Sequence, residues 1–172
     1  MRKLFYAIIL INFGITNLYA DIVFEKDFKY CNKHQLTFFL KKIYDVYLCN
    51  NNSETLNYET IYQQDFALLI NYNMSFDSDY LAKSSVKSMS EYFPMSKSIE
   101  TSYYNELLAI FPDVEKSDVI EARYSNYSIE FFYNNKKIGF LNDKAFVTSF
   151  LDIWLRFNSK YPRMQYDLFN QK

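Results

Sequence analysis

Few residues in this 172-residue sequence have the type and spacing that catalysis requires. Cys31 and His34 are three positions apart, and a thiol beside an imidazole can act as a nucleophile. Both lie in a predicted loop where no third residue would orient the ring, so we expect a solvated histidine. His34 is the only histidine, and no Cys/His cluster has the spacing of metal ligands. We therefore expect no zinc site and no cofactor.

Three acidic residues, Asp113, Glu115 and Asp118, could serve as carboxylate ligands. They lie between a predicted helix and a predicted strand, so a polar connection is the simpler interpretation. Lys136 and Lys137 occupy a predicted hairpin, where solvated lysines are common. We accordingly predict no catalytic residue and no metal ligand.

Lys42 and Tyr44 are two residues apart on a predicted strand, which places them on the same face of it. If that face is turned toward the helices, both side chains contribute to a pocket. The alternative is that Lys42 points into solvent and Tyr44 packs in the core, because lysine is seldom buried without a partner.

The two cysteines, Cys31 and Cys49, flank a segment that contains no turn signal. Residues 36–48 are predicted to form one long strand, whose ends would be about 40 Å apart. A disulfide needs Cα atoms within about 7 Å. We therefore predict that the two cysteines are not bonded to each other, unless a hairpin occurs at Lys41 and Lys42.

The remaining elements are predicted from periodicity and caps. Strands are expected over residues 21–28, 66–72, 118–124, 127–131 and around Gly139, where the missing side chain would let a neighbouring element approach closely. Helices are expected after Asp77, before Pro112, after Asn142 or Asp143, and over residues 164–169. The third helix carries a wide apolar surface that must be buried against the sheet. The sequence thus predicts an α+β fold, an antiparallel β-sheet with a layer of helices packed on one face.

The N-terminal segment has the pattern of a signal peptide. Arg2 and Lys3 precede an apolar run over residues 4–15, and Ala20 offers a small residue before Asp21. We predict a signal peptide over residues 1–20 and one domain over residues 21–172, periplasmic or secreted, with no transmembrane segment after cleavage. The alternative is an uncleaved N-terminal anchor. With 19 basic and 20 acidic residues, the chain lacks the basic excess of a nucleic-acid-binding protein.

Five segments in a fixed order resemble the chalcone isomerase-like family, in particular its small bacterial secreted members. They are residues 42–48, 66–72, 77–81, 111–118 and 131–155, the last of which contains both Phe-Tyr-Asn and Ile-Trp-Leu. Ser117 stands where the family usually has glycine. The resemblance covers roughly residues 36–169 and implies the open-faced sandwich of that family.

The resemblance does not extend to isomerase activity. Plant chalcone isomerases use an arginine on the sheet and a threonine on the long strand beside the substrate oxygen. The threonine position corresponds to Lys42, and the arginine has no counterpart, because the arginines after the signal peptide are Arg123, Arg156 and Arg163. The cation and donors that such a reaction aims at its oxyanion are therefore not matched.

Other members of the family bind fatty acids between the sheet and the helices, with a basic residue and a tyrosine at the carboxylate. The resemblance assigns these positions to Lys42 and Tyr44. The leading hypothesis is an exported, non-catalytic protein that binds a fatty acid or another hydrophobic small ligand. The alternatives are a structural or protein-partner-binding domain without a ligand, and an isomerase or lyase with a different set of residues.

Overall fold

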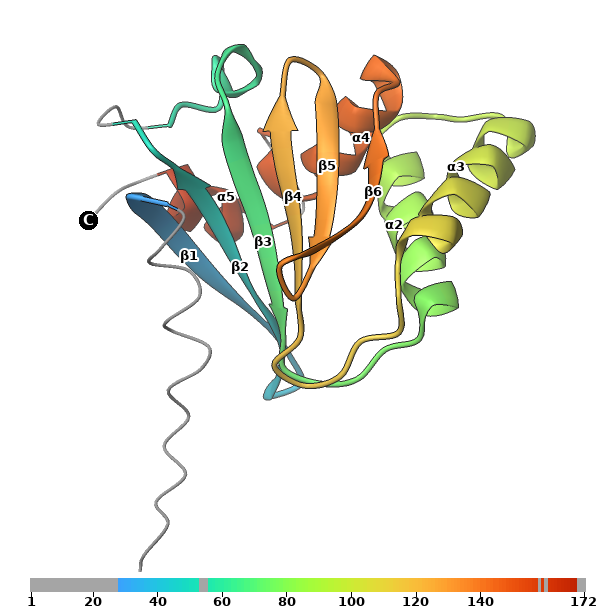
Figure 1. The fold of residues 1–172 in the computed structure, drawn as a ribbon, viewed down its shortest axis with the longest axis horizontal. Coiled ribbons are helices and arrows are strands. Elements are labelled where there is room, and N and C mark those ends of the chain that lie inside the picture. The colour runs from blue at the N-terminus through green and yellow to red at the C-terminus, as the bar shows by residue number, and fades with distance from the viewer. Residues whose placement is uncertain (1–27, 53–55, 158, 160, 170–172) are drawn as a thin grey trace, which may run out of the picture.

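The computed structural model describes residues 28–52, 56–157, 159 and 161–169. Within them, six strands form one antiparallel sheet in which every strand pairs with its neighbours in sequence (Figure 1). The strands are β1 Tyr30–Phe38, β2 Lys41–Asn50, β3 Phe66–Tyr72, β4 Val119–Ser125, β5 Ser128–Tyr133 and β6 Lys136–Leu141. The predicted signal peptide and, except for Phe28, the predicted strand over residues 21–28 lie outside the described residues.

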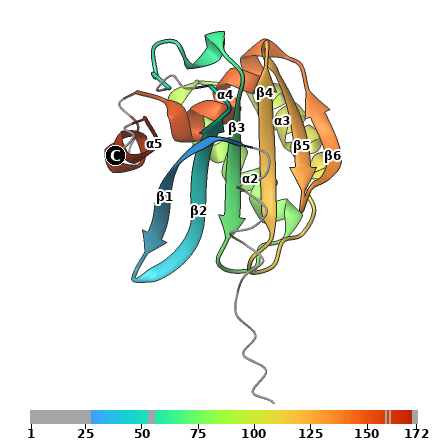
Figure 2. The same cartoon turned by 60° about the vertical axis from the view of Figure 1, so that its left-hand side comes forward.

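Four helices of the described chain cover one face of this sheet, as the turned view in Figure 2 shows. Between β3 and β4 come α2 Ser78–Tyr92 and α3 Lys97–Ile110; after β6 come α4 Lys144–Leu155 and α5 Pro162–Phe169. The predicted α+β fold is thereby confirmed. None of the helices in the described residues has both the length and the apolarity to span a bilayer.

Local signals position the helices as the sequence predicts. The carboxylate of Asp77 accepts a hydrogen bond from the backbone N–H of Tyr80 at 2.6 Å, and Asp143 caps α4 in the same way. Helix α3 ends just before Pro112, which cannot continue a helix.

The core lies between the sheet and the helices. Val46, Leu48, Leu68 and Ile70 point from β2 and β3 toward the helical layer. A smaller cluster of Cys49, Ala67 and Leu69 is buried on the opposite face of the same two strands. Strand β3 is thus buried on both faces, as its nearly continuous apolar run predicts.

The prediction of one long strand over residues 36–48 is wrong. The chain reverses at Phe39 and Leu40, which join β1 to β2 as a two-residue turn with φ angles of 45° and 65°. Such turns usually contain Asn or Gly, since those residues adopt positive φ most easily. The sequence gives no turn signal here, because Phe39 and Leu40 are large and apolar and continue the apolar run that begins at Leu36.

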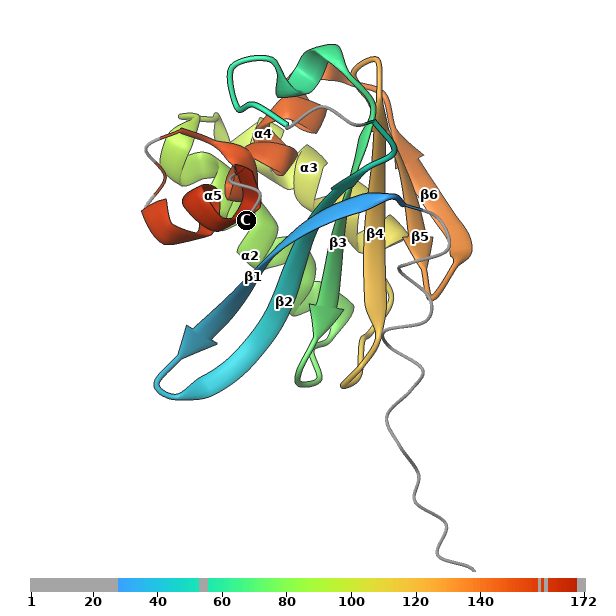
Figure 3. The same cartoon turned by 90° about the vertical axis from the view of Figure 1, so that its left-hand side faces the viewer.

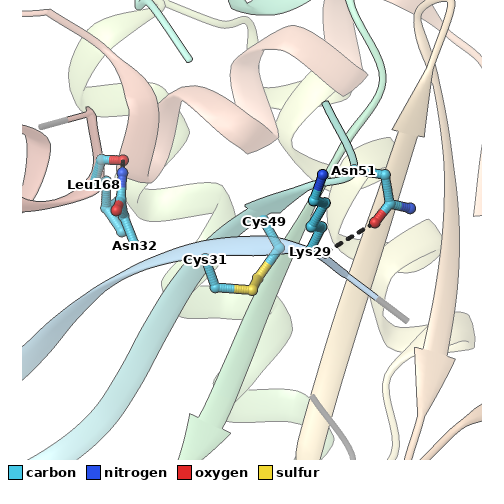
Figure 4. Close-up of a disulfide and its surroundings, with 6 residues drawn as sticks. All are labelled: Lys29, Cys31, Asn32, Cys49, Asn51 and Leu168. Atoms are coloured by element: carbon cyan, nitrogen blue, oxygen red, sulfur yellow. Dashed lines mark hydrogen bonds between the residues drawn. A yellow bond between two sulfur atoms is a disulfide. The ribbon is translucent and has the colours of Figure 1, made fainter. Parts of the chain in front are cut away.

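The prediction of unbonded cysteines is wrong for the same reason. The reversal places Cys31 directly opposite Cys49, with Cα atoms 4.1 Å apart, and the two form a disulfide (Figure 4). Disulfides persist in oxidising compartments, so this pairing suggests an extracytoplasmic protein.

The expectation that His34 lies in a loop is also wrong, because this residue is on β1. Its Nδ1 lies 2.9 Å from a carboxylate oxygen of Asp167 on α5. Beside it, the side-chain amide of Asn32 donates to the carbonyl of Leu168 at 3.0 Å (Figure 4). These contacts attach the outermost strand to the last helix, which covers the edge of the sheet.

Gly139 on β6 has the close neighbour that the sequence predicts. A Cβ at this position would lie 2.8 Å from Cγ1 of Ile110, at the end of α3. Isoleucine is stiff at χ1, so it cannot easily move aside. The glycine therefore sets how closely α3 approaches the sheet.

Replacing both cysteines by serine should lower the free energy of unfolding by about 3 kcal/mol, because the disulfide closes a short loop in the unfolded chain. The two cysteines are 18 residues apart. Denaturant unfolding with and without dithiothreitol measures the effect. Reductant should destabilise the wild type and leave the serine variant unchanged; a wild type that is indifferent to reductant would contradict the disulfide.

Gly139→Ala should lower the free energy of unfolding by about 1–3 kcal/mol through overpacking against Ile110. In an Ile110→Ala background the same substitution should cost much less, because the clashing Cγ atoms are gone. Equal losses in the two backgrounds, measured by thermal or denaturant unfolding, would show that the contact is not responsible.

Candidate functional site: a cavity between the sheet and the helices

A cavity of about 240 Å³ lies between the inner face of the sheet and the helical layer. It is more enclosed than the two larger hollows of the described chain, a lysine-lined groove between α2 and α3 and a polar hollow around Asn50–Asn52 and Arg123. Its walls are Leu36, Ile43, Tyr44, Ile70, Tyr72, Phe76, Tyr80, Leu81, Ser84, Ser85, Ser88, Phe111, Ile120, Phe150, Ile153, Trp154, Tyr161 and Met164. No charged side chain is among these described residues.

A β-bulge shapes the wall that β2 contributes. Leu36 pairs with Tyr44 and Thr37 with Lys42, so Ile43 is an extra residue that has no partner on β1. A bulge interrupts the strict alternation of faces. Ile43 and Tyr44, although adjacent, therefore both line the cavity.

The two predicted site residues are separated by this bulge. Tyr44 lines the cavity, whereas Lys42 is exposed beside the β1–β2 turn and is not among the lining residues. The argument that residues two apart share a face does not hold across a bulge.

The polar part of the cavity is built from phenol and indole groups. The indole N–H of Trp154 donates a hydrogen bond to the hydroxyl of Tyr44 at 3.1 Å. The ring of Tyr44 meets that of Tyr72 edge to face, with centroids 6.5 Å apart. Burial raises the pKa of both tyrosines well above its usual range, so both keep their protons at neutral pH. A phenol oxygen that accepts one hydrogen bond can still donate one to a ligand.

Helix α2 contributes hydroxyl groups that the sequence analysis missed. Leu81, Ser84, Ser85 and Ser88 follow the i, i+3, i+4, i+7 spacing of one helix face and line the cavity. The hydroxyl of Ser84 donates to the carbonyl of Leu81 at 3.1 Å. The sequence does contain a signal for this wall of the cavity: Ser84, Ser85 and Ser88 lie beside the apolar stripe of the helix.

The other residues with potential chemistry have structural partners instead. Cys31 is in the disulfide, so it cannot form a nucleophilic pair with His34. Asp113 accepts the backbone N–H of Ser78 at 2.7 Å, and Asp118 accepts that of Glu115 at 2.7 Å. Among the described residues, no three His, Cys, Asp or Glu side chains gather in a way that could hold a metal ion.

Comparison with known proteins shows a similarity in structure but none in sequence. No protein-family model matches the chain, and no curated protein sequence matches it. A solved structure does: a fatty-acid binding protein of Arabidopsis thaliana superposes with a TM-score of 0.56 over 81% of this chain and 84% of that chain. The chain has the chalcone isomerase-like fold. With 9% sequence identity, the likeness shows the fold alone.

The chalcone isomerase-like fold is what the five ordered segments predict. Ser117, which replaces the usual glycine, has a φ of 77°, so this residue adopts the left-handed conformation that glycine accommodates most easily.

Filling the cavity should abolish uptake of an apolar probe of matching size. Ser88→Phe should weaken binding of 1-octanol more than tenfold, because the ring would take much of the space that a buried chain needs. Fluorescence of Trp154, the only tryptophan, reports occupancy. Ser90→Phe is the matched control, since Ser90 lies on the same helix but lines the outer groove. Equal loss in both variants would contradict the site.

Proposed function

We propose that this protein is an exported, non-catalytic binding protein that holds a fatty acid or another hydrophobic small ligand between its sheet and its helices. The observation that carries the proposal is the mostly apolar, partly enclosed cavity whose wall includes the hydrogen-bonded Tyr44–Trp154 pair. Pockets for small ligands have this character, mostly apolar walls with a few placed polar groups.

The volume of the cavity limits the ligand. At about 30 Å³ for a water-sized group, it holds roughly eight such groups. An apolar chain of about eight carbons therefore matches the space.

The arginines support a role without isomerase chemistry. Arg123 pairs with Glu121, Arg156 lies over the ring of Phe93, and Arg163 is near Asp167. None of the three lines the cavity. A developing oxyanion in the cavity would meet the hydroxyl of Tyr44 but no guanidinium, and catalysis of that type rests on such charge stabilisation.

The head group of the ligand lies at Tyr44 in this proposal. The hydroxyl of Tyr44 donates a hydrogen bond to the carboxylate or alcohol oxygen of the ligand. Lys42, whose ammonium group is carried on a flexible four-carbon stem, balances the charge of a carboxylate from outside the cavity. The role of Lys42 stays a prediction. Export rests on the disulfide and on the N-terminal pattern.

Native mass spectrometry of the protein isolated from an exporting host, followed by lipid extraction, tests the proposal. We expect a bound amphiphile, and in its absence uptake of octanoate and 1-octanol followed by Trp154 fluorescence. A bare mass and no uptake of either compound would favour the alternative, a structural or partner-binding domain.

The two predicted site residues can be separated in the same titration. Lys42→Ala should weaken octanoate binding about tenfold, the loss of one charge-assisted contact, and leave 1-octanol unchanged. Tyr44→Phe should weaken both ligands. Lys41→Ala is the matched control for Lys42, because it removes an equally exposed neighbouring charge. Octanoate binding that is the same in all three would place the head group elsewhere.

A further inference from the structure

The turn between β1 and β2 presents three large apolar side chains in succession. Phe38, Phe39 and Leu40 are 65%, 85% and 99% exposed. Figures 2 and 3 show the end of this hairpin extending beyond the helical layer, where no helix covers it. We refer to residues 38–42 as the hairpin tip. Apolar side chains in this number on a projecting turn are unusual for a surface that meets only water.

The residue types at the hairpin tip oppose the backbone conformation. Phe39 and Leu40 both have positive φ, which bulky side chains disfavour. In the described chain, the β4–β5 turn has Asn126 and Tyr127 at these left-handed positions, and the β5–β6 turn has Asn134 and Asn135. Each of those turns thus contains at least one asparagine, whereas the β1–β2 turn contains none. Phe39 and Leu40 together reduce stability and place two apolar side chains in water, a combination that points to a binding role.

Positive charge lies immediately behind the apolar residues. Lys41 pairs with Phe38 across the hairpin and Lys42 with Thr37. Both lysines are exposed, and neither has an ion-pair partner in the described residues. From Lys29 to Tyr44 the hairpin contains no acidic residue. Apolar side chains in front of a short cationic band match the acyl and headgroup levels of an anionic bilayer.

We propose that the hairpin tip inserts into the surface of an anionic lipid bilayer. Phe38, Phe39 and Leu40 enter the boundary between headgroups and acyl chains, and Lys41 and Lys42 contact lipid phosphates. Three side chains at the end of a narrow hairpin offer far less than the roughly 800 Å² per partner of a stable protein interface. A bilayer requires no complementary surface and accepts this small apolar point.

The same hairpin connects the tip to the cavity. Three residues that line the cavity lie near the tip on its two arms: Leu36 on β1, and Ile43 and Tyr44 on β2. Insertion of the tip therefore brings this wall of the cavity to the membrane surface. The bilayer proposal rests on the tip alone and holds whether or not the cavity binds a ligand.

Vesicle flotation with Phe39→Asn/Leu40→Gly provides the main test. This variant restores the preferred turn residues, so it should keep or raise the melting temperature while vesicle binding falls more than tenfold. The vesicles are phosphatidylcholine with one quarter phosphatidylglycerol. Phe140→Ser is the matched control, because Phe140 is 60% exposed on β6 and lies outside the tip. All variants carry the same N-terminal residues. Unchanged flotation of the double variant would overturn the proposal.

The contribution of the lysine charge to vesicle binding is tested separately. Lys41→Ser should weaken binding to the anionic vesicles about fivefold and leave binding to pure phosphatidylcholine unchanged. A loss of equal size on both vesicles would contradict the headgroup contact.

A reporter at the tip measures insertion directly. With Phe39→Trp in a Trp154→Phe background, vesicles of brominated acyl chains should quench the fluorescence, whereas Phe140→Trp in that background should not be quenched. Absence of quenching at position 39 would overturn insertion. So would a tip-dependent dimer in sedimentation without vesicle binding, which would assign the tip to a second copy of the chain. Uptake of 1-octanol by Phe39→Asn/Leu40→Gly should stay normal, so failure of this proposal and failure of ligand binding are distinguishable.

Discussion

The packing of α4 against the inner face of the sheet is the contact on which the rest of the structure depends. Phe146, Phe150, Leu151 and Trp154 of α4 are all buried. The ring of Phe150 meets those of Phe131 on β5 and Trp154 on α4, with centroids 5.5 Å and 5.4 Å away. Burial of such aromatic surface is the largest favourable contribution that a sheet and a helix can make.

The cavity occurs where that packing is incomplete. On the β5 side, Phe150 of α4 packs against Phe131. On the β2 side, the extra residue at Ile43 changes the path of the strand, and Tyr44 meets Trp154 through a hydrogen bond instead of close apolar packing. Serines from α2 add hydroxyl groups where larger apolar side chains would have filled the space. The site therefore lies beside the packed aromatic region of Phe131, Phe150 and Trp154.

The β1–β2 hairpin meets two requirements at once. Its outer strand is an edge, and unpaired edges invite association with other chains. The disulfide, the Asn32 contact with α5 and the His34–Asp167 pair hold this edge to the body of the protein. At the far end of the hairpin, the side chains of Phe38, Phe39 and Leu40 are exposed.

Most of the architecture could be predicted from the sequence, because the signals that define it are local. Caps at Asp77 and Asp143, the stop at Pro112 and the apolar stripe of α4 each operate within a few residues, and Gly139 signals its close contact by lacking a side chain. The β1–β2 turn could not be predicted. Its left-handed residues, Phe39 and Leu40, lie at the end of a hairpin that is held together by cross-strand pairing and by the disulfide between Cys31 and Cys49, which are 18 residues apart.

The sequence by itself thus determined the layers, the order of most elements and the aromatic character of the core, since these follow from short-range periodicity. Only the tertiary structure decided which surfaces meet. The bulge at Ile43 directs Tyr44 toward the cavity and leaves Lys42 in solvent, and the reversal at Phe39 joins Cys31 to Cys49. Strand register sets both outcomes, and register depends on pairing between distant residues.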